Sequence, residues 1–220
     1  LKGCPLRCAW CHNPESMDPR PEPMLKVEHC LSCELCTPVC KEGLTGNLAQ
    51  VGHPDERCTR CGQCVAVCPT EARQMSGRLY PVPELIEEVR RDEVYHHQSR
   101  GGVTFSGGEP LTAGNAPFVL QSLEELSRHG IHTAVDTCGQ VSSDLLLHAA
   151  SLADLILYDL KIMDSKKHQE STGTGNERIH ENLHLLMEKD TPVWVRVPLI
   201  PGHTNDEENL EAMADFLMGL

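Results

Sequence analysis

The sequence lacks an excess of positive charge, a long apolar run and a secretory leader, and each absence excludes a class of protein. Its formal net charge is −13, whereas a nucleic-acid-binding protein usually presents a basic face, so we expect no nucleic-acid partner. No apolar run approaches the roughly 18 residues of a membrane span, and no signal peptide precedes the first cysteines. We therefore expect a cytoplasmic protein with no membrane segment.

An initiator methionine is also missing, because the chain opens on Leu1-Lys2-Gly3, directly before a cysteine motif. We expect both chain ends to be truncated, with a first strand reduced to these residues and a sheet left with exposed edges. The 220 residues are still enough to bury a substantial core of one or two domains.

Cysteine, by contrast, is abundant: 11 of the 12 cysteines lie within residues 4–68. Disulfides would suit an even count, but tight clusters in a chain of cytosolic character favour metal sites. The first cluster is Cys4-x3-Cys8-x2-Cys11. Three thiolates on one loop leave one iron of a cubane cluster open, as a catalytic metal site requires. The alternative is a zinc site completed by a distant ligand such as His12.

A second group of cysteines forms an internal repeat. Its halves, offset by 28 residues, are Cys30-x2-Cys33-x2-Cys36-x3-Cys40 and Cys58-x2-Cys61-x2-Cys64-x3-Cys68. Few apolar residues separate these cysteines, so metal must organise the segment. The repeat resembles the two-cluster bacterial ferredoxins, in which the fourth cysteine of each run ligates the other cluster. The resemblance implies one cluster on Cys30, Cys33, Cys36 and Cys68 and another on Cys58, Cys61, Cys64 and Cys40. The alternative is zinc, with four ligands in each half.

Strands and helices alternate after Leu79. The patterns predict strands at 103–106, 132–136, 155–160 and 193–197, and helices at 83–95, 116–129, 143–150, 176–189 and 206–217. Such alternation implies a parallel sheet with right-handed crossovers. Ligands of these sheets bind at the carboxyl ends of the strands, where the polar motifs of this chain fall.

The cysteine loop, with Trp10 before its last cysteine, and the turn Gly107-Gly108-Glu109-Pro110 resemble the radical S-adenosylmethionine superfamily. The resemblance implies that this turn holds the methionine amino group. Glycine has no Cβ, so the backbone can approach a ligand closely. Glu109 then accepts a hydrogen bond from the ammonium or orients the turn.

Three further stretches, together with the ferredoxin-like repeat, resemble the glycyl-radical-enzyme activating enzymes, which are relatives of the pyruvate formate-lyase activase. They are Asp136-Thr137-Cys138-Gly139, Tyr158-Asp159-Leu160-Lys161 and Val195-Arg196-Val197-Pro198-Leu199-Ile200-Pro201-Gly202. The resemblance implies an α/β fold, namely a partial (β/α) TIM-like barrel of the radical S-adenosylmethionine type over residues 1–29 and 70–220. A ferredoxin-like insert with two [4Fe–4S] clusters occupies residues 30–69. Cys138 replaces the usual Asn of the family, and we interpret it as a small filler, not a ligand.

Two carboxylates at neighbouring strand ends repel each other unless a cation or an ammonium lies between them. The family resemblance implies a monovalent cation bound by Asp136, Thr137 and Asp159. It also implies that Lys161 pairs with the methionine carboxylate, a solvent-facing lysine being the alternative. His203 is assigned to the ribose, with an ordinary loop histidine as its alternative.

The implied reaction begins with an electron from reduced flavodoxin or ferredoxin. Reductive cleavage of S-adenosylmethionine then gives a 5′-deoxyadenosyl radical, which takes hydrogen from a glycine of a partner glycyl radical enzyme. The cofactors perform the difficult step, while the protein chelates, orients and excludes water. One rival interpretation is a radical enzyme that acts on a small molecule or another peptide residue. The others are an electron-transfer iron–sulfur protein and a zinc-binding interaction protein.

Iron content tests the cysteine assignments. Anaerobic reconstitution should load roughly 12 irons, in three clusters of four. Changing Cys4, Cys8 and Cys11 together to Ala should remove about a third of the iron and all cleavage of S-adenosylmethionine, because only this group leaves an iron open. The measurements are iron per chain and 5′-deoxyadenosine. Cleavage that survives the triple change would show that the catalytic assignment is wrong.

Overall fold

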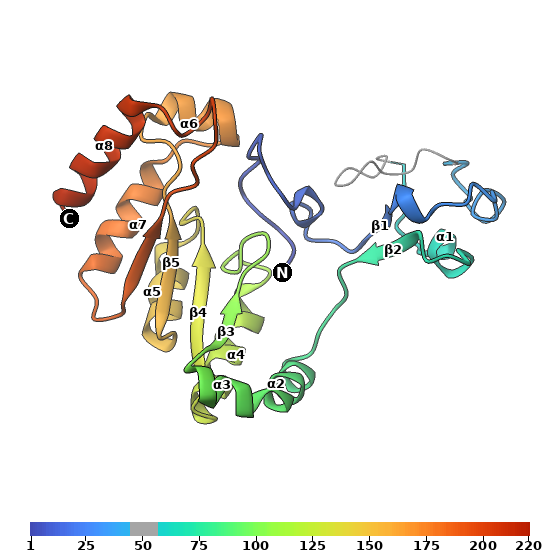
Figure 1. The fold of residues 1–220 in the computed structure, drawn as a ribbon, viewed down its shortest axis with the longest axis horizontal. Helices are drawn as coiled ribbons and strands as arrows, with labels where there is room; N and C mark the ends of the chain where they lie inside the picture. The colour runs from blue at the N-terminus through green and yellow to red at the C-terminus, as the bar shows by residue number, and fades with distance from the viewer. Residues whose placement is uncertain (45–56) are drawn as a thin grey trace.

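Four parallel strands form the central sheet of the protein. The computed structural model describes residues 1–44 and 57–220, so part of the predicted insert at 30–69 lies outside the described residues. The strands are β3 (Gly102–Phe105), β4 (His132–Thr137), β5 (Leu155–Asp159) and β6 (Val193–Arg196). They pair in the order β3-β4-β5-β6, all parallel (Figure 1). This sheet confirms the four predicted strands and the predicted α/β fold.

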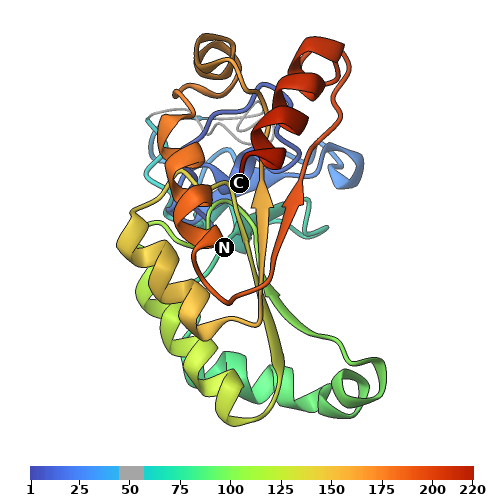
Figure 2. The ribbon, with the colours of Figure 1, turned by 90° about the vertical axis from the view of Figure 1, so that its left-hand side faces the viewer.

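Helices cover one face of this sheet (Figure 2). They are α4 (Ala116–Arg128), α5 (Ser143–Leu152) and α7 (Glu177–Met187). Side chains from both layers form the core, and Leu123, Leu146, Ile156, Tyr158 and Leu183 are all 0% exposed. The last helix, α8 (Glu207–Met218), lies against α7, with the Phe216 ring centred 4.7 Å from the His180 ring. The helix-covered face is therefore closed, and it leaves the opposite face of the strands for polar chemistry.

Two helical segments differ from the prediction. The predicted helix 83–95 is two helices, α2 (Val82–Arg91) and α3 (Glu93–Ser99), because Asp92 leaves the helical conformation with φ −100° and ψ 10°. Helix α6 (Ser165–Thr172) has no apolar periodicity that could have predicted it. It is set instead by its ends. The Asp164 side chain accepts a hydrogen bond from the Lys167 backbone N–H at 2.7 Å, and Gly173 ends the helix with φ +89°.

A small antiparallel sheet joins the two ends of the cysteine-rich segment. Strand β1 (Glu22–Leu25) pairs with β2 (Arg73–Ser76), with Leu25 opposite Arg73. Short helices flank it at η1 (Pro14–Ser16), η2 (Val27–His29) and α1 (Gln63–Ala66). Figure 1 shows this part of the chain standing apart from the parallel sheet. Residues 14–29 read as a linker in the sequence, but they contain β1, whose partner lies about 50 residues later and is invisible to local patterns.

The first three residues run beside the end of β3. The Leu1 nitrogen donates to the Ser106 carbonyl at 2.9 Å, and the Gly108 N–H donates to the Leu1 carbonyl at 2.9 Å. The Glu109 N–H donates to the Gly3 carbonyl at 2.6 Å. These bonds attach the start of the cysteine motif to the carboxyl end of the sheet. Within residues 1–44 and 57–220, no helix is long and apolar enough to cross a membrane.

The buried Tyr158 hydroxyl gives a test of this packing. It donates to the Ile179 carbonyl at 2.6 Å, which joins β5 to α7. Tyr158→Phe removes this hydrogen bond between β5 and α7, and we expect the free energy of unfolding to fall by about 0.5–1.5 kcal/mol. Tyr80→Phe is the control, because its hydroxyl bonds the exposed Glu88. Denaturant titration of the reconstituted proteins measures both, and equal losses in the two variants would contradict the packing described.

Candidate functional site

The cysteine loop at residues 4–11 lies against the end of α6. The Arg7 N–H donates to the Thr172 carbonyl at 2.6 Å, and the Ala9 N–H donates to the Ser171 carbonyl at 3.0 Å. The Arg7 side chain then folds back onto the Cys4 carbonyl at 2.6 Å. Figure 1 shows this amino-terminal segment beside the carboxyl ends of the strands. A helix without apolar periodicity thus has a clear function: it fixes the loop that carries the thiols.

Cys4, Cys8 and Cys11 are free thiols, each partly buried. The Cys4 thiol bonds to the buried Cys138 thiol, which lowers the pKa of Cys4 to about 7. Burial raises the pKa of Cys8 to about 11, and the positive charge of Lys161 partly opposes that rise. Three unpaired thiols on one fixed loop are a donor set that fits an iron–sulfur cluster, whose ligands are Cys thiolates.

The turn after β3 is built for close contact with the chain's own backbone. Gly107 has φ +126°, a conformation that favours glycine. A Cβ at Gly108 would overlap the Gly3 carbonyl oxygen and would lie 2.7 Å from that of Ser16. The two glycines therefore let the segment before the cysteine loop approach the end of β3. The close approach expected towards a ligand is, in the structure, an approach to residues 3 and 16.

Glu109 points inward from this turn and is 0% exposed. Its carboxylate accepts hydrogen bonds from the Leu111 N–H at 2.9 Å, the Cys138 N–H at 2.8 Å and the Thr137 hydroxyl at 2.9 Å. Burial raises the pKa of Glu109, and these hydrogen bonds act in the opposite direction. Of the two roles open to Glu109 from the sequence, its contacts match the orientation of the turn.

The exposed face of the strands carries a group of four charged side chains. Lys161 donates to Asp159 Oδ2 at 2.9 Å, and Arg196 donates to Asp159 Oδ1 from Nε at 3.0 Å. Arg196 also bonds Asp136 on the next strand, and Asp136 Oδ2 accepts from the Ser106 hydroxyl at 2.9 Å. The Lys161 side chain is only 9% exposed. The solvent-facing alternative for Lys161 is therefore wrong.

The side chains of the three expected cation ligands do not lie on one face of the sheet. Successive side chains of a strand point to opposite faces, and β4 contains both Asp136 and Thr137. Asp136 lies on the open face, whereas Thr137 is 1% exposed on the helix-covered face, where it bonds Glu109. The side chains of Asp136, Thr137 and Asp159 therefore do not fit one shared cation site, and the guanidinium of Arg196 joins the two carboxylates instead.

His203 lies beside the cysteine loop. Its ring centroid is 5.0 Å from that of Trp10, the residue before Cys11. Its side chain is otherwise exposed, in the loop that follows β6. The loop histidine is thus brought to the same edge of the sheet as the cysteines, Asp159 and Lys161.

Comparison with known proteins identifies the family of this chain. The family model of the radical SAM superfamily matches residues 55–217. The chain belongs to the radical SAM superfamily. The trans-4-hydroxy-L-proline dehydratase activating enzyme of Clostridioides difficile is 37% identical over 100% of this chain and 74% of its own length. The choline trimethylamine-lyase activating enzyme of Oleidesulfovibrio alaskensis is 38% identical over 99% of this chain and 71% of its own length.

Solved structures agree with this placement. A domain of the pyruvate-formate lyase-activating enzyme from Bacteroides vulgatus is 40% identical, with a TM-score of 0.51 over 55% of this chain and 73% of that one. Streptococcus suis SuiB bound to S-adenosylmethionine is 19% identical, with a TM-score of 0.51 over 66% of this chain and 33% of its own, which shows the fold alone. Within the superfamily, the chain is a glycyl-radical-enzyme activating enzyme. Such enzymes generate a radical on a partner enzyme.

The second group of cysteines in this activating enzyme borders a small cavity. Cys40, Cys58, Cys61 and Cys64 all line it, although Cys40 comes from the other half of the repeat. Among residues 1–44 and 57–220, no three His, Cys, Asp or Glu side chains converge as ligands of one metal ion. A cubane cluster places each thiolate on a different iron, so its ligands need not converge on one point as those of zinc do.

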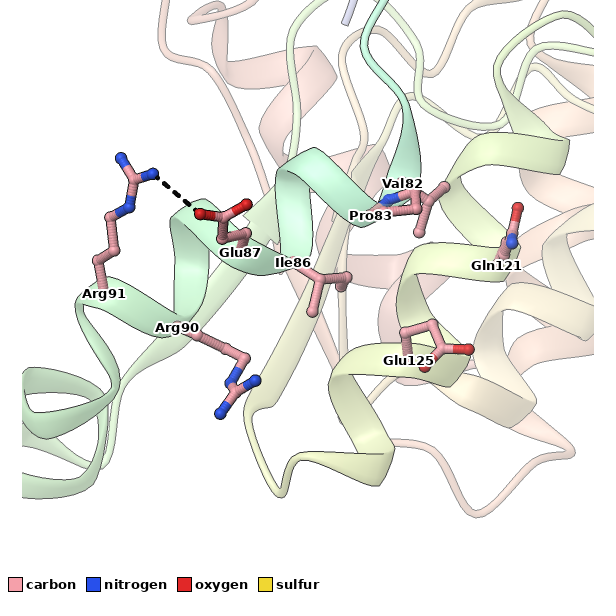
Figure 3. A pocket seen from close by; sticks show the side chains of 8 residues that line it. All are labelled: Val82, Pro83, Ile86, Glu87, Arg90, Arg91, Gln121 and Glu125. Atoms are coloured by element: carbon pink, nitrogen blue, oxygen red, sulfur yellow. Dashed lines mark hydrogen bonds and ion pairs between the residues drawn. The ribbon is translucent and has the colours of Figure 1, made fainter.

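The helix surface carries an unrelated cavity of about 530 Å³ between α2 and α4 (Figure 3). Apolar atoms of Val82 and Ile86 line its floor, and the ion pair of Arg91 with Glu87 stands at its rim. None of the site residues predicted from the sequence borders it. The cavity therefore has no part in the site predicted at the strand ends.

Sequence reasoning left three contributors to the site without a function. From the sequence, Arg196 is quoted only as part of a family motif, Ser106 is given no role and Cys138 is interpreted as a filler. The position of Arg196 offered a signal, because Arg196 ends one predicted strand and Asp159 lies at the end of another. The structure shows the two residues in register on neighbouring strands. No local pattern links Cys138 to Cys4, since that contact depends on how the loop is placed.

Glu109→Gln separates the two roles considered for this carboxylate. An amide offers one acceptor oxygen in place of two and turns an N–H₂ group towards existing donors. We expect the free energy of unfolding to fall by about 1–3 kcal/mol without S-adenosylmethionine present. Glu125→Gln on the exposed side of α4 is the matched control. A variant with unchanged thermal stability but weakened S-adenosylmethionine binding would instead support contact with the ammonium.

Proposed function

We propose that this activating enzyme binds S-adenosylmethionine at the carboxyl ends of β3, β4 and β5 and places a radical on a glycine of its partner. The observation that carries the proposal is the nearly buried Lys161, held by Asp159 within electrostatic reach of Cys4 and Cys8. A fixed positive charge next to free thiols is what a zwitterionic, cluster-bound cosubstrate requires. The ordinary use of a surface lysine does not account for its burial.

Each side chain has a defined task in this proposal. A [4Fe–4S] cluster on Cys4, Cys8 and Cys11 supplies, when bound, the electron that cleaves S-adenosylmethionine to methionine and a 5′-deoxyadenosyl radical. Lys161 pairs with the methionine carboxylate. The turn at Gly107 and Gly108 offers backbone acceptors to the amino group.

The remaining contacts position the nucleoside and its surroundings. In this proposal His203, whose ring lies beside that of Trp10, contacts the ribose. Glu109 holds the turn and the end of β4 in place by its three hydrogen bonds. These fixed groups orient the cosubstrate before reaction, so little reorganisation remains for the reactive step.

We also propose three [4Fe–4S] clusters, two of them in a ferredoxin-like unit at residues 30–69 that interrupts the barrel of residues 1–29 and 70–220. One cluster uses Cys58, Cys61, Cys64 and Cys40, and the cavity that these four line supports the interleaved pairing. The other uses Cys30, Cys33, Cys36 and Cys68. Reduced flavodoxin or ferredoxin is the electron donor, and free thiols of this number suit the reducing cytoplasm.

The partner is proposed from the names of the relatives. These are activating enzymes of a dehydratase, of lyases and of a synthase. The relatives are between 35% and 39% identical to this chain, whichever partner enzyme they activate. Sequence identity therefore does not single out one partner. We therefore propose a glycyl radical enzyme of this general kind, and the enzyme encoded beside the gene is the one to assay.

Lys161→Ala tests the proposed site. Each charge-assisted hydrogen bond contributes about 1.5–3 kcal/mol, so its loss should weaken S-adenosylmethionine binding by about one to two orders of magnitude. Iron content should not change, because no cysteine is involved. Lys167→Ala is the control, since Lys167 forms an exposed ion pair with Glu208. The measurements are the Kd for S-adenosylmethionine, 5′-deoxyadenosine and the glycyl radical signal by electron paramagnetic resonance.

Three outcomes would contradict the proposal in different ways. Unchanged binding in Lys161→Ala would remove Lys161 from the site. Formation of 5′-deoxyadenosine without a radical on the partner would favour a small molecule or another peptide residue as substrate. Absence of 5′-deoxyadenosine in a fully loaded wild-type protein would favour an electron-transfer protein.

A further inference from the structure

The charged side chains at the strand ends are paired with one another. Each of the four carboxylate oxygens of Asp136 and Asp159 accepts a hydrogen bond from a side chain. The donors are Arg196 and Ser106 for Asp136, and Arg196 and Lys161 for Asp159. Two carboxylates are thus matched by two permanently positive groups, and the charges sum to zero.

Arg196 suits the position between the carboxylates for geometric reasons. It comes from β6 directly in register with Asp159, and its Nη2 atom bonds both Asp159, at 2.8 Å, and Asp136 on the strand beyond. A guanidinium presents several N–H donors in a rigid plane, so one side chain can bridge two acceptors. A metal ion in the same place would compete with these donors and would add a third positive charge to a balanced group.

The remaining ligand of a cation site is turned away. The Thr137 hydroxyl lies on the other face of β4 and donates to Glu109, so only the carboxylates of Asp136 and Asp159 face the open side. The structure therefore has two carboxylates bridged by a guanidinium. The expected site has two carboxylates and a hydroxyl around one ion. The side chain of Arg196 is 42% exposed, so solvent ions have access to the place it holds.

We infer that Arg196 is the built-in counter-cation of this site. It joins Asp136 to Asp159 in place of a monovalent metal ion, and it makes the assembly of the strand ends independent of Na⁺ and K⁺. Arg196 is thereby a positioning residue: it sets the orientation of Asp159, which in turn holds Lys161. The inference rests on the contacts among these side chains, and the proposed function enters only through what Lys161 binds.

The test exchanges the cation around the whole protein. Thermal unfolding of the reconstituted wild-type chain is compared in KCl and in choline chloride at equal ionic strength, without S-adenosylmethionine. We expect the same Tm in both salts. In Arg196→Gln the two carboxylates lose their bridge, and K⁺ should then raise the Tm by about 2–4 °C over choline, as saturable binding to the folded state does.

Controls separate this effect from a general loss of charge. Arg128→Gln removes a positive charge from an exposed ion pair with Glu125 on α4, and its Tm should not depend on the cation. If Arg196→Gln does not fold in choline chloride, recovery of the circular dichroism signal in KCl is the same measurement. A second arm measures the Kd for S-adenosylmethionine in both salts. We expect the Kd to be cation-independent in the wild type and K⁺-dependent in Arg196→Gln.

Either of two results would overturn the inference. One is a wild-type Tm that rises with K⁺ in a saturable manner. The other is an Arg196→Gln variant that is destabilised but gains nothing from K⁺ beyond the gain of Arg128→Gln. Because the first arm contains no S-adenosylmethionine, its outcome is distinct from failure of the proposed function, which would appear as absent binding in both salts.

Discussion

Parallel pairing of the strands is the constraint on which the rest of this structure depends. Because β3 to β6 all run in one direction, the residues that end each strand meet at one edge. Ser106, Asp136, Asp159 and Arg196 are up to 90 residues apart in the sequence, yet they form one hydrogen-bonded row. The cysteine loop reaches the same edge because residues 1–3 run beside the end of β3 and α6 receives residues 7 and 9.

The two faces of the sheet differ in burial, and the polar side chains on them differ in role. On the helix-covered face, Glu109, Thr137 and Tyr158 are hydrogen-bonded and inaccessible, so they fix the strand ends relative to one another. On the open face, Lys161 and Arg196 compensate the carboxylates and remain within reach of a ligand. A single strand, β4, contributes to both faces through the neighbours Asp136 and Thr137. Successive residues of the same strand therefore provide buried support on one face and a solvent-accessible charge on the other.

This division explains which of the sequence-based expectations succeeded. The strands and most helices followed from periodicity, and the cysteine spacing pointed to the family that the comparisons then showed. Helix α6 and strand β1 were not predicted, because α6 has no apolar stripe and β1 is defined only by a partner strand far along the chain. The motif Asp136-Thr137 was treated as one ligand set, although the period of a strand sends its two side chains in opposite directions.

The sequence by itself determined the four parallel strands and most of the helices between them, the cysteine groups and the presence of charged residues at the strand ends. Those features are local, since they depend on spacing, periodicity and residue type. Only the tertiary structure decided that Glu109 faces inward, that Cys138 touches Cys4 and that Arg196 bridges two carboxylates. Each of these contacts joins segments whose relative position is fixed by the packing of the whole sheet. Hydrogen bonds and ion pairs act over a few ångströms, so residue type alone does not specify their partners.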